Sequence, residues 1–177
     1  MVRVVDHDPA WAAAFLDAAA RIAAALDIDA GRIHHVGSTA VPWTTAKPII
    51  DMLLEAESLE FLDDRTVRLE ALGWQAMGEF GIPGRRYFRM HDADGNRTHH
   101  LHAFVRGAPD VWRHLAFRDY LCAHPAIAAE YGALKSGLAQ AHPGDIDAYM
   151  DGKDAFVREH ERRALAWSMA HGDAAGS

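Results

Sequence analysis

The sequence predicts an α+β fold, in which a small mixed sheet is flanked by helices and the C-terminal half is helical. Two short apolar runs, Ile33–Val36 and Ile49–Leu54, are each bounded by turn residues, which is typical of buried strands. From about Asp110 onward the apolar residues recur with helical spacing instead. This order, a helix, then a sheet, then helices, is found in α+β proteins.

The first helix is expected from Pro9 to about Leu26. Asp8 is a favourable N-cap, Pro9 suits the first helical position, and the Ala-rich segment that follows places its large apolar residues near one face. A second helix is expected at Ser58–Leu72, because glycine is common directly after a helix and Gly73 occupies that position.

Three more strands are expected after this helix, at Trp74–Phe80, Arg86–Met90 and Thr98–Val105. The segment Asp92–Asn96 contains an Asp-Gly pair and an asparagine, which favour a tight turn. The last two strands should therefore form a hairpin.

The helical half is expected to hold three helices, at Val111–Ala123, at Pro125–Ala141 and from Asp145 onward. Residues 1–171 are long enough for one domain with a proper core and too short for two comfortable ones. Residues 172–177 are expected to form a disordered tail.

Composition limits the function. The formal net charge of −7 argues against general nucleic-acid binding, since phosphate contacts need clustered Lys and Arg. The single cysteine, Cys122, excludes an intramolecular disulfide and a zinc ribbon, which is consistent with a reducing cytoplasm. Neither a membrane-spanning run nor a secretion signal is visible. We expect a cytoplasmic protein with a small-molecule or nucleotide substrate, no membrane partner and an oligomeric state that the sequence does not indicate.

Two histidines on one strand suggest a metal site. His100 and His102 are two residues apart, so both imidazoles project from one face of the strand, while Leu101 and Ala103 project from the other, apolar face. Neutral imidazole is a good ligand for divalent ions such as Zn, Mn or Fe. The alternative is that both histidines form hydrogen bonds on a polar face of the sheet.

The loop between the first two strands is suited to an anion. Gly37, Ser38 and Thr39 combine a flexible backbone with hydroxyl groups and amides that can hold phosphate. Lys47 could reach the same anion, or it could pair with a nearby carboxylate. Asp51 lies inside the apolar second strand, where a carboxylate requires a metal, a cation or hydrogen-bond donors as partners.

Other basic and acidic residues are weaker candidates. Arg85 and Arg86 follow a loop with Gly-Pro-Gly, and arginine suits bidentate capture of phosphate, although one of the two is expected to be a solvated surface charge. Glu79 could add a second carboxylate to a metal site. No Ser-His-Asp arrangement, Walker loop or dinucleotide-binding glycine motif is present.

The motifs resemble those of a known family. HVGSTAVP at residues 35–42 and AKPIID at residues 46–51 are similar to the GrpB family (UPF0157 type), whose members have a nucleotidyltransferase fold of the polymerase-beta type. The resemblance continues at residues 81–88, 98–102 and 117–121, and thus covers nearly the whole chain.

The resemblance implies positions for several residues. It implies that the strands of Asp51 and His102 are neighbours, so that Asp51, His100 and His102 converge on one divalent ion, Mg, Mn, Zn or Fe. His35 matches the histidine that precedes the Gly-Ser pair and should line the pocket. Lys153 matches a position in the helical half and could bind the ligand, as could Lys135, although a solvated helix face is the alternative for both.

One departure affects the expected chemistry. Nucleotidyltransferases usually carry a second carboxylate two residues after the first, and here that position is Leu53. The resemblance implies a metal-dependent nucleotidyl or phosphoryl transferase that acts on a small molecule, with Asp51, Lys47 and Arg86 as catalytic residues. One alternative is a non-catalytic domain that binds a nucleotide or a coenzyme A-related ligand, because similar domains occur fused to dephospho-coenzyme A kinase. Another is a single-metal enzyme of a different reaction class.

Overall fold

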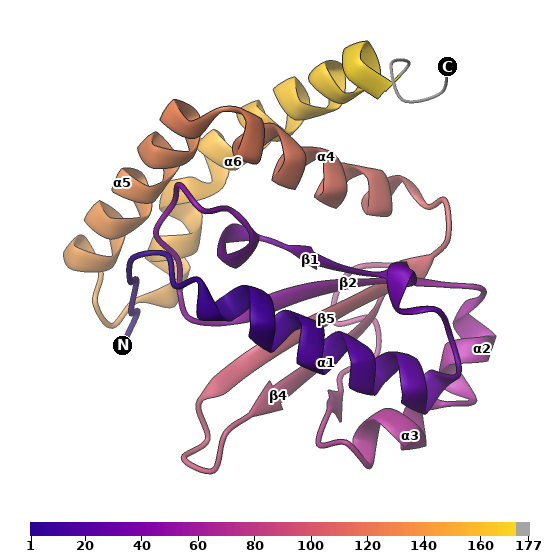
Figure 1. Cartoon of the computed structure of the whole chain (residues 1–177). Coiled ribbons are helices and arrows are strands. Elements are labelled where there is room, and N and C mark those ends of the chain that lie inside the picture. The colour runs from indigo at the N-terminus through magenta and orange to yellow at the C-terminus, as the bar shows by residue number, and fades with distance from the viewer. Residues whose placement is uncertain (173–177) are drawn as a thin grey trace.

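A five-stranded mixed sheet forms the centre of the protein in a computed structural model that describes residues 1–172 (Figure 1). The spatial order of the strands is β1-β2-β5-β4-β3. Only the central β2–β5 pair is parallel, and the other three pairs are antiparallel. The strands are β1 (Ile33–Val36), β2 (Ile50–Ala56), β3 (Gln75–Ala76), β4 (Arg86–His91) and β5 (Arg97–Val105). The mixed sheet predicted from the sequence is therefore confirmed.

Helices cover both faces of this sheet (Figure 1). Helix α1 lies along one face, and the C-terminal helices lie on the opposite side. The helices are α1 (Ala10–Leu26), α2 (Leu59–Asp63), α3 (Thr66–Glu70), α4 (Pro109–Ala123), α5 (Pro125–Ala141) and α6 (Ile146–Gly172), with short 3-10 turns η1 (Ala30–Arg32) and η2 (Ser38–Ala40). Of the tail expected to be disordered, Gly172 ends α6 and residues 173–177 lie outside the described residues. None of the helices in the described part of the chain is long and apolar enough to cross a membrane.

Side-chain caps explain where several helices begin. Asp8 accepts a hydrogen bond from the amide of Ala10, Ser58 from that of Phe61, and Asp145 from that of Ala148. Each cap satisfies an amide that has no partner within the helix. These are the helix starts that the sequence indicates.

Two predicted elements are shorter than expected. The helix predicted at Ser58–Leu72 is broken into α2 and α3 at Arg65, whose ψ of 2° is not helical, while the hydroxyl of Thr66 bonds the carbonyl of Leu62. The strand predicted at Trp74–Phe80 ends at Ala76. Gly78 and Phe80 both have positive φ angles, and an extended strand cannot continue through such residues.

The two faces of the sheet bury different groups. Met52, Leu54, Leu101 and Ala103 pack in a core shared with α1. On the other face Leu53 lies in a smaller cluster with Phe104 of β5 and Val111 of α4. Because side chains alternate along a strand, Asp51, His100 and His102 share the face of Leu53 and point toward the C-terminal helices.

Candidate metal and phosphate site

Asp51, His100 and His102 converge on the central pair of strands. The parallel register places His100 opposite Asp51 and His102 opposite Leu53. The Oδ1 atom of Asp51 lies 3.3 Å from Nδ1 of His100 and 3.4 Å from Nε2 of His102. One potential ligand atom from each residue lies within 4.8 Å of the others. The structure thus brings together the three residues that the family resemblance implies.

The two histidines keep Asp51 ionised. Burial by itself raises the pKa of the Asp51 carboxyl, but the hydrogen bonds from His100 and His102, with a smaller electrostatic contribution from the two rings, outweigh burial and hold the pKa below its ordinary value. An ionised carboxylate beside two imidazoles is ready to bind a cation without first losing a proton.

Arg85 controls the proton on His102. Its Nη1 atom lies 3.3 Å from Nδ1 of His102 and can only donate, so His102 accepts there and carries its own proton on Nε2, toward Asp51. Arg85 also donates to the carbonyls of Glu79 and Phe80. Ligation of an ion by Nε2 of His102 therefore requires that Arg85 give up this bond.

Arg85 corrects one expectation from the sequence. It was expected to bind phosphate, but it is buried, and Nε, Nη1 and Nη2 each have a partner within the protein. Arg85 positions His102 instead of facing a ligand.

The cluster lies at a cavity of about 230 Å³ between the sheet and the C-terminal helices. Ser38 and Thr39 of the loop after β1 also line this cavity. The chain contains three lysines, Lys47, Lys135 and Lys153, and all three line it as well. Apart from the histidines, all other basic residues are arginines. A cavity that gathers every lysine of an acidic protein is suited to an anion.

Lys135 is the residue that sequence reasoning undervalued. Its side chain is 2% exposed, and its ammonium group donates to Ser38 Oγ at 2.7 Å and to the carbonyl of Thr45. Burial, together with the charges of Lys153 and Lys47, lowers the pKa of Lys135 to about 7. The scarcity of lysine in a chain rich in arginine was the signal that could have identified it.

The ring of Tyr149 lies close to the ammonium groups of the other two lysines, Lys47 and Lys153. Its ring centroid lies 5.6 Å from Nζ of Lys47 and 5.1 Å from Nζ of Lys153, in cation–π geometry. Burial lowers the pKa of Lys153 to about 8 and also lowers that of Lys47. The buried hydroxyl of Tyr149 has no hydrogen-bond partner, although buried polar groups normally have one. The hydrogen-bonding capacity of this hydroxyl is therefore unused within the described part of the protein.

Gly37 allows the loop after β1 to pass close to Asp51. Its φ is +70°, and a Cβ atom at this position would lie 2.7 Å from Oδ2 of Asp51. Both the backbone conformation and the contact therefore exclude other residues.

Substitution Gly37→Ala is expected to destabilise the fold by about 1–3 kcal/mol, because alanine strains the positive φ and displaces the Asp51 carboxylate. Thermal unfolding would measure the loss. Gly137→Ala in α5 is the control, since no atom lies within 4 Å of the added Cβ, and it should stabilise the protein by about 0.5–1 kcal/mol. Equal stability of the two variants would contradict this account of the loop.

His35 lies on the opposite face from the cluster. It pairs with Met52 in the sheet, stacks on Phe15 of α1 at 4.9 Å between ring centroids, and bonds Oγ1 of Thr39 at 2.8 Å. Burial lowers the pKa of His35 to about 4, so the ring is neutral at pH 7. The expectation that His35 lines the pocket is thus corrected, and its contact with the site is indirect, through Thr39.

Arg86 and Glu79 also lie away from the cluster. Arg86 lies opposite Ala103 in the sheet, on the α1 face, and forms a bidentate pair with Asp63 at 2.7 and 2.9 Å. The carboxylate of Glu79 accepts a hydrogen bond from the amide of Gly84 at 2.6 Å. Because side chains alternate along a strand, Arg86 lies on the face opposite the cluster. Glu79 is hydrogen-bonded within a local turn. Arg86 therefore does not have the catalytic role, nor Glu79 the metal-ligand role, that was expected from the sequence.

Substitution Arg86→Ala is therefore expected to leave the affinity for divalent ions and for pyrophosphate within about twofold of wild type, since it is remote from both sets of ligands. Metal and pyrophosphate titrations of the purified variant would measure this. A loss of tenfold or more in either affinity would restore Arg86 to the site.

The donor set fits a transition metal ion. One carboxylate and two imidazoles suit Zn, Mn or Fe, whereas Mg prefers oxygen ligands. Asp51 is ionised, and Nε2 of His100 is buried without a partner. His102 becomes the third ligand once Arg85 gives up its hydrogen bond to Nδ1 of His102.

Comparisons with known proteins agree with this architecture. UPF0157 protein YqkA of Bacillus subtilis is 42% identical over 176 residues, which cover 99% of this chain and 51% of YqkA. A dephospho-CoA kinase of Mycolicibacterium paratuberculosis is 33% identical over 194 residues, which cover 97% of this chain and 48% of the kinase. The chain thus spans about half the length of each of these two relatives.

A solved structure and a family model identify the chain more directly. The crystal structure of conserved protein GrpB from Enterococcus faecalis matches with a TM-score of 0.88 and 43% identity, over 94% of this chain and 99% of that one. The family model described as GrpB protein matches residues 1–163. The chain therefore belongs to the GrpB family.

Proposed function

We propose that this protein is a divalent-metal-dependent enzyme that transfers a nucleotidyl or phosphoryl group to a small molecule. One observation carries the proposal: the Asp51, His100 and His102 cluster and all three lysines line a single cavity. A phosphate ester with a bound cation needs such an arrangement, with metal ligands on one side and ammonium groups on the other.

We also propose that the fold is of the polymerase-beta nucleotidyltransferase type. Gly37 and Ser38 follow β1, and Asp51 lies in β2, the neighbouring strand. This order of a Gly-Ser pair and an acidic strand supports the assignment, although fold alone does not establish function.

The roles of the residues follow from their positions. Asp51, His100 and His102 would hold the ion, which when bound supplies Lewis-acid stabilisation of charge on phosphate oxygens. Lys135 and Lys153 would neutralise the charge that develops on the transferred group. Lys47 and the hydroxyls of Ser38 and Thr39 would orient the remaining phosphate oxygens.

A second candidate function is a binding domain without catalysis. The position of the second carboxylate is occupied by Leu53, which is fully buried beside Phe104 and Val111. This apolar cluster leaves no room for a second ion in the usual place. Since one relative is named dephospho-CoA kinase, dephospho-coenzyme A is a suitable ligand to test for this alternative.

Metal analysis followed by thermal-shift measurements tests the proposal. Purified protein is screened with pyrophosphate, ATP and dephospho-coenzyme A, with and without Mg, Mn, Zn and Fe, and turnover is followed by phosphorus NMR. Metal-dependent stabilisation by ATP together with turnover supports a transferase. Stabilisation without metal favours the binding domain, and tight Zn or Fe without any response to phosphate ligands favours a different single-metal reaction.

The lysines provide an independent readout of the site. Because every lysine lines the cavity, amine acetylation followed by mass spectrometry reports on the cavity and, elsewhere, only on the N-terminus. We expect pyrophosphate to protect Lys47 and Lys153 from acetylation, whereas Lys135, which is 2% exposed, should react slowly with or without pyrophosphate. Unchanged labelling of Lys47 and Lys153 at saturating pyrophosphate would contradict the phosphate site.

A further inference from the structure

We infer that a second, larger cavity beside the phosphate site binds the nucleoside part of a nucleoside polyphosphate. This inference rests on the proposed function and names the substrate class for it. The larger cavity measures about 910 Å³, within the range of about 300–1,000 Å³ that is usual for binding sites of drug-sized ligands. The phosphate cavity, at about 230 Å³, is too small to enclose a whole nucleotide.

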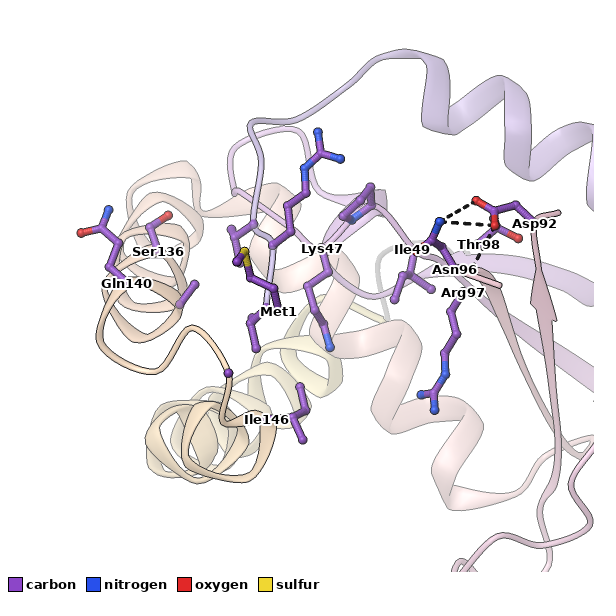
Figure 2. Close-up of a pocket in the computed structure, with 16 residues that line it drawn as sticks. Met1, Lys47, Ile49, Asp92, Asn96, Arg97, Thr98, Ser136, Gln140 and Ile146 are labelled. Atoms are coloured by element: carbon purple, nitrogen blue, oxygen red, sulfur yellow. Dashed lines mark hydrogen bonds between the residues drawn. The ribbon is translucent and has the colours of Figure 1, made fainter. Parts of the chain in front are cut away.

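Several segments distant in sequence form the walls of the larger cavity (Figure 2). They are the N-terminal segment Met1–Val4, the loop before β2, the turn between β4 and β5, the C-terminal end of α5 and the start of α6. Figure 2 shows the side chains of Lys47, Arg97 and Ile146 extending into the same space.

The two cavities are adjacent, since Lys47 and Ile49 line both. The ammonium group of Lys47 lies 5.6 Å from the ring centroid of Tyr149, which lines the phosphate cavity. The side chain of Lys47 therefore lies at the junction. In the proposed complex the phosphates lie among the three lysines, and the nucleoside lies beyond Lys47 in the larger cavity.

The walls of the larger cavity are suited to a nucleoside. Ile49, Ala139 and Ile146 offer apolar surface, and Ser136 offers a neutral hydrogen-bonding group of the kind that recognises a base or a ribose. Ile146 is 48% exposed, so its apolar surface is accessible to a ligand.

The charges of the larger cavity also favour a polyphosphate. Arg97 adds a cation near Lys47. Burial is the main cause that lowers the pKa of Lys47, Asp51 raises this pKa, and the charge of Arg97 lowers it by a smaller amount. The carboxylate in the wall, Asp92, accepts hydrogen bonds from Asn96 and from the amide of Asp94, as the dashed lines in Figure 2 show for Asn96. Its charge is thus directed into the turn, away from an incoming ligand.

The test compares a probe that consists of phosphate alone with a probe that also carries a nucleoside, the part assigned to the larger cavity. Dissociation constants for pyrophosphate and for ATP are measured by calorimetry in the presence of Mn²⁺. Substitution Ala139→Trp fills the larger cavity, and Ala133→Trp, an exposed position of the same helix outside both cavities, is the matched control. Ile146→Ala is a second variant, which removes a contact at an exposed position and so leaves the fold intact.

Ala139→Trp is expected to weaken ATP binding about tenfold or more and to leave pyrophosphate binding within about twofold, while Ala133→Trp changes neither. Ile146→Ala should weaken ATP binding alone, by a smaller factor. If wild type binds ATP no more tightly than pyrophosphate, or if both Ala139→Trp and Ile146→Ala bind ATP normally, the inference is wrong and the proposed function stands. If wild type binds neither probe, the proposed function fails, and the inference fails with it.

Discussion

Substitution His102→Ala is expected to abolish the uptake of a divalent ion. The change leaves Asp51 and His100 as the remaining ligands, and loss of a direct ligand should exceed the cost of about 10–100-fold in affinity that follows loss of an outer-shell partner. His100→Ala should have an effect of the same size. Competition titrations of Zn²⁺ and Mn²⁺ against a chromogenic chelator would measure both variants.

His99→Ala is the matched control for this experiment. His99 lies on the same strand but on the opposite face, where its ring packs 5.9 Å from that of Trp74. The His99→Ala variant should retain full ion uptake even if the substitution lowers the stability of the fold. Unchanged uptake in His102→Ala, or an equal loss in His99→Ala, would show that the cluster is not the ion site.

The second large effect concerns Lys135 and pH. The free protein loses protons from Lys135 and Lys153 above about pH 7 and pH 8, and only the charged forms attract phosphate. Bound pyrophosphate favours the protonated lysines, so binding at pH 8 should take up protons, and affinity should fall as pH rises from about 7 to about 9. Calorimetry in two buffers with different ionisation enthalpies measures this uptake.

Lys135→Met should remove most of the proton uptake and weaken pyrophosphate binding by about tenfold or more. Arg21→Met, which removes an exposed cation from α1, is the control and should change neither quantity. Binding that releases protons, or proton uptake that survives in Lys135→Met, would contradict the assigned role.

The same pKa has a consequence for folding. Since the pKa of Lys135 is lower in the folded protein than in the unfolded chain, the unfolded chain binds more protons between about pH 7 and pH 10.5. The contribution of Lys135 to stability therefore rises with pH across this window. Lys135→Met should abolish this part of the pH dependence of the free energy of unfolding, as urea titrations at several pH values would show.

Local patterns in the sequence were sufficient to predict most of the elements. The alternation of His100 and His102 with Leu101 and Ala103 predicts one polar and one apolar face, and the folded chain has both. Strand periodicity, helix caps and the Asp-Gly turn act over a few residues, so the sequence displays them directly.

The site needed information of longer range. Periodicity places His34 and His35 on opposite faces, but only the strand order decides that His35 turns toward α1 and Asp51 toward the C-terminal helices. For the same reason Arg86, which the sequence suggests as a phosphate ligand, pairs with Asp63 on the α1 face, opposite the cluster.

The amino-acid order thus indicated the α+β class and the family, and the family resemblance implied the cluster of Asp51, His100 and His102. The fold decided that Lys135 and Lys153, on two different helices, join Lys47 around one cavity, and that Arg85 belongs to the protein interior. The physical reason is that a helical pattern specifies which residues share a face, whereas the packing of α5 and α6 over the sheet determines what that face contacts.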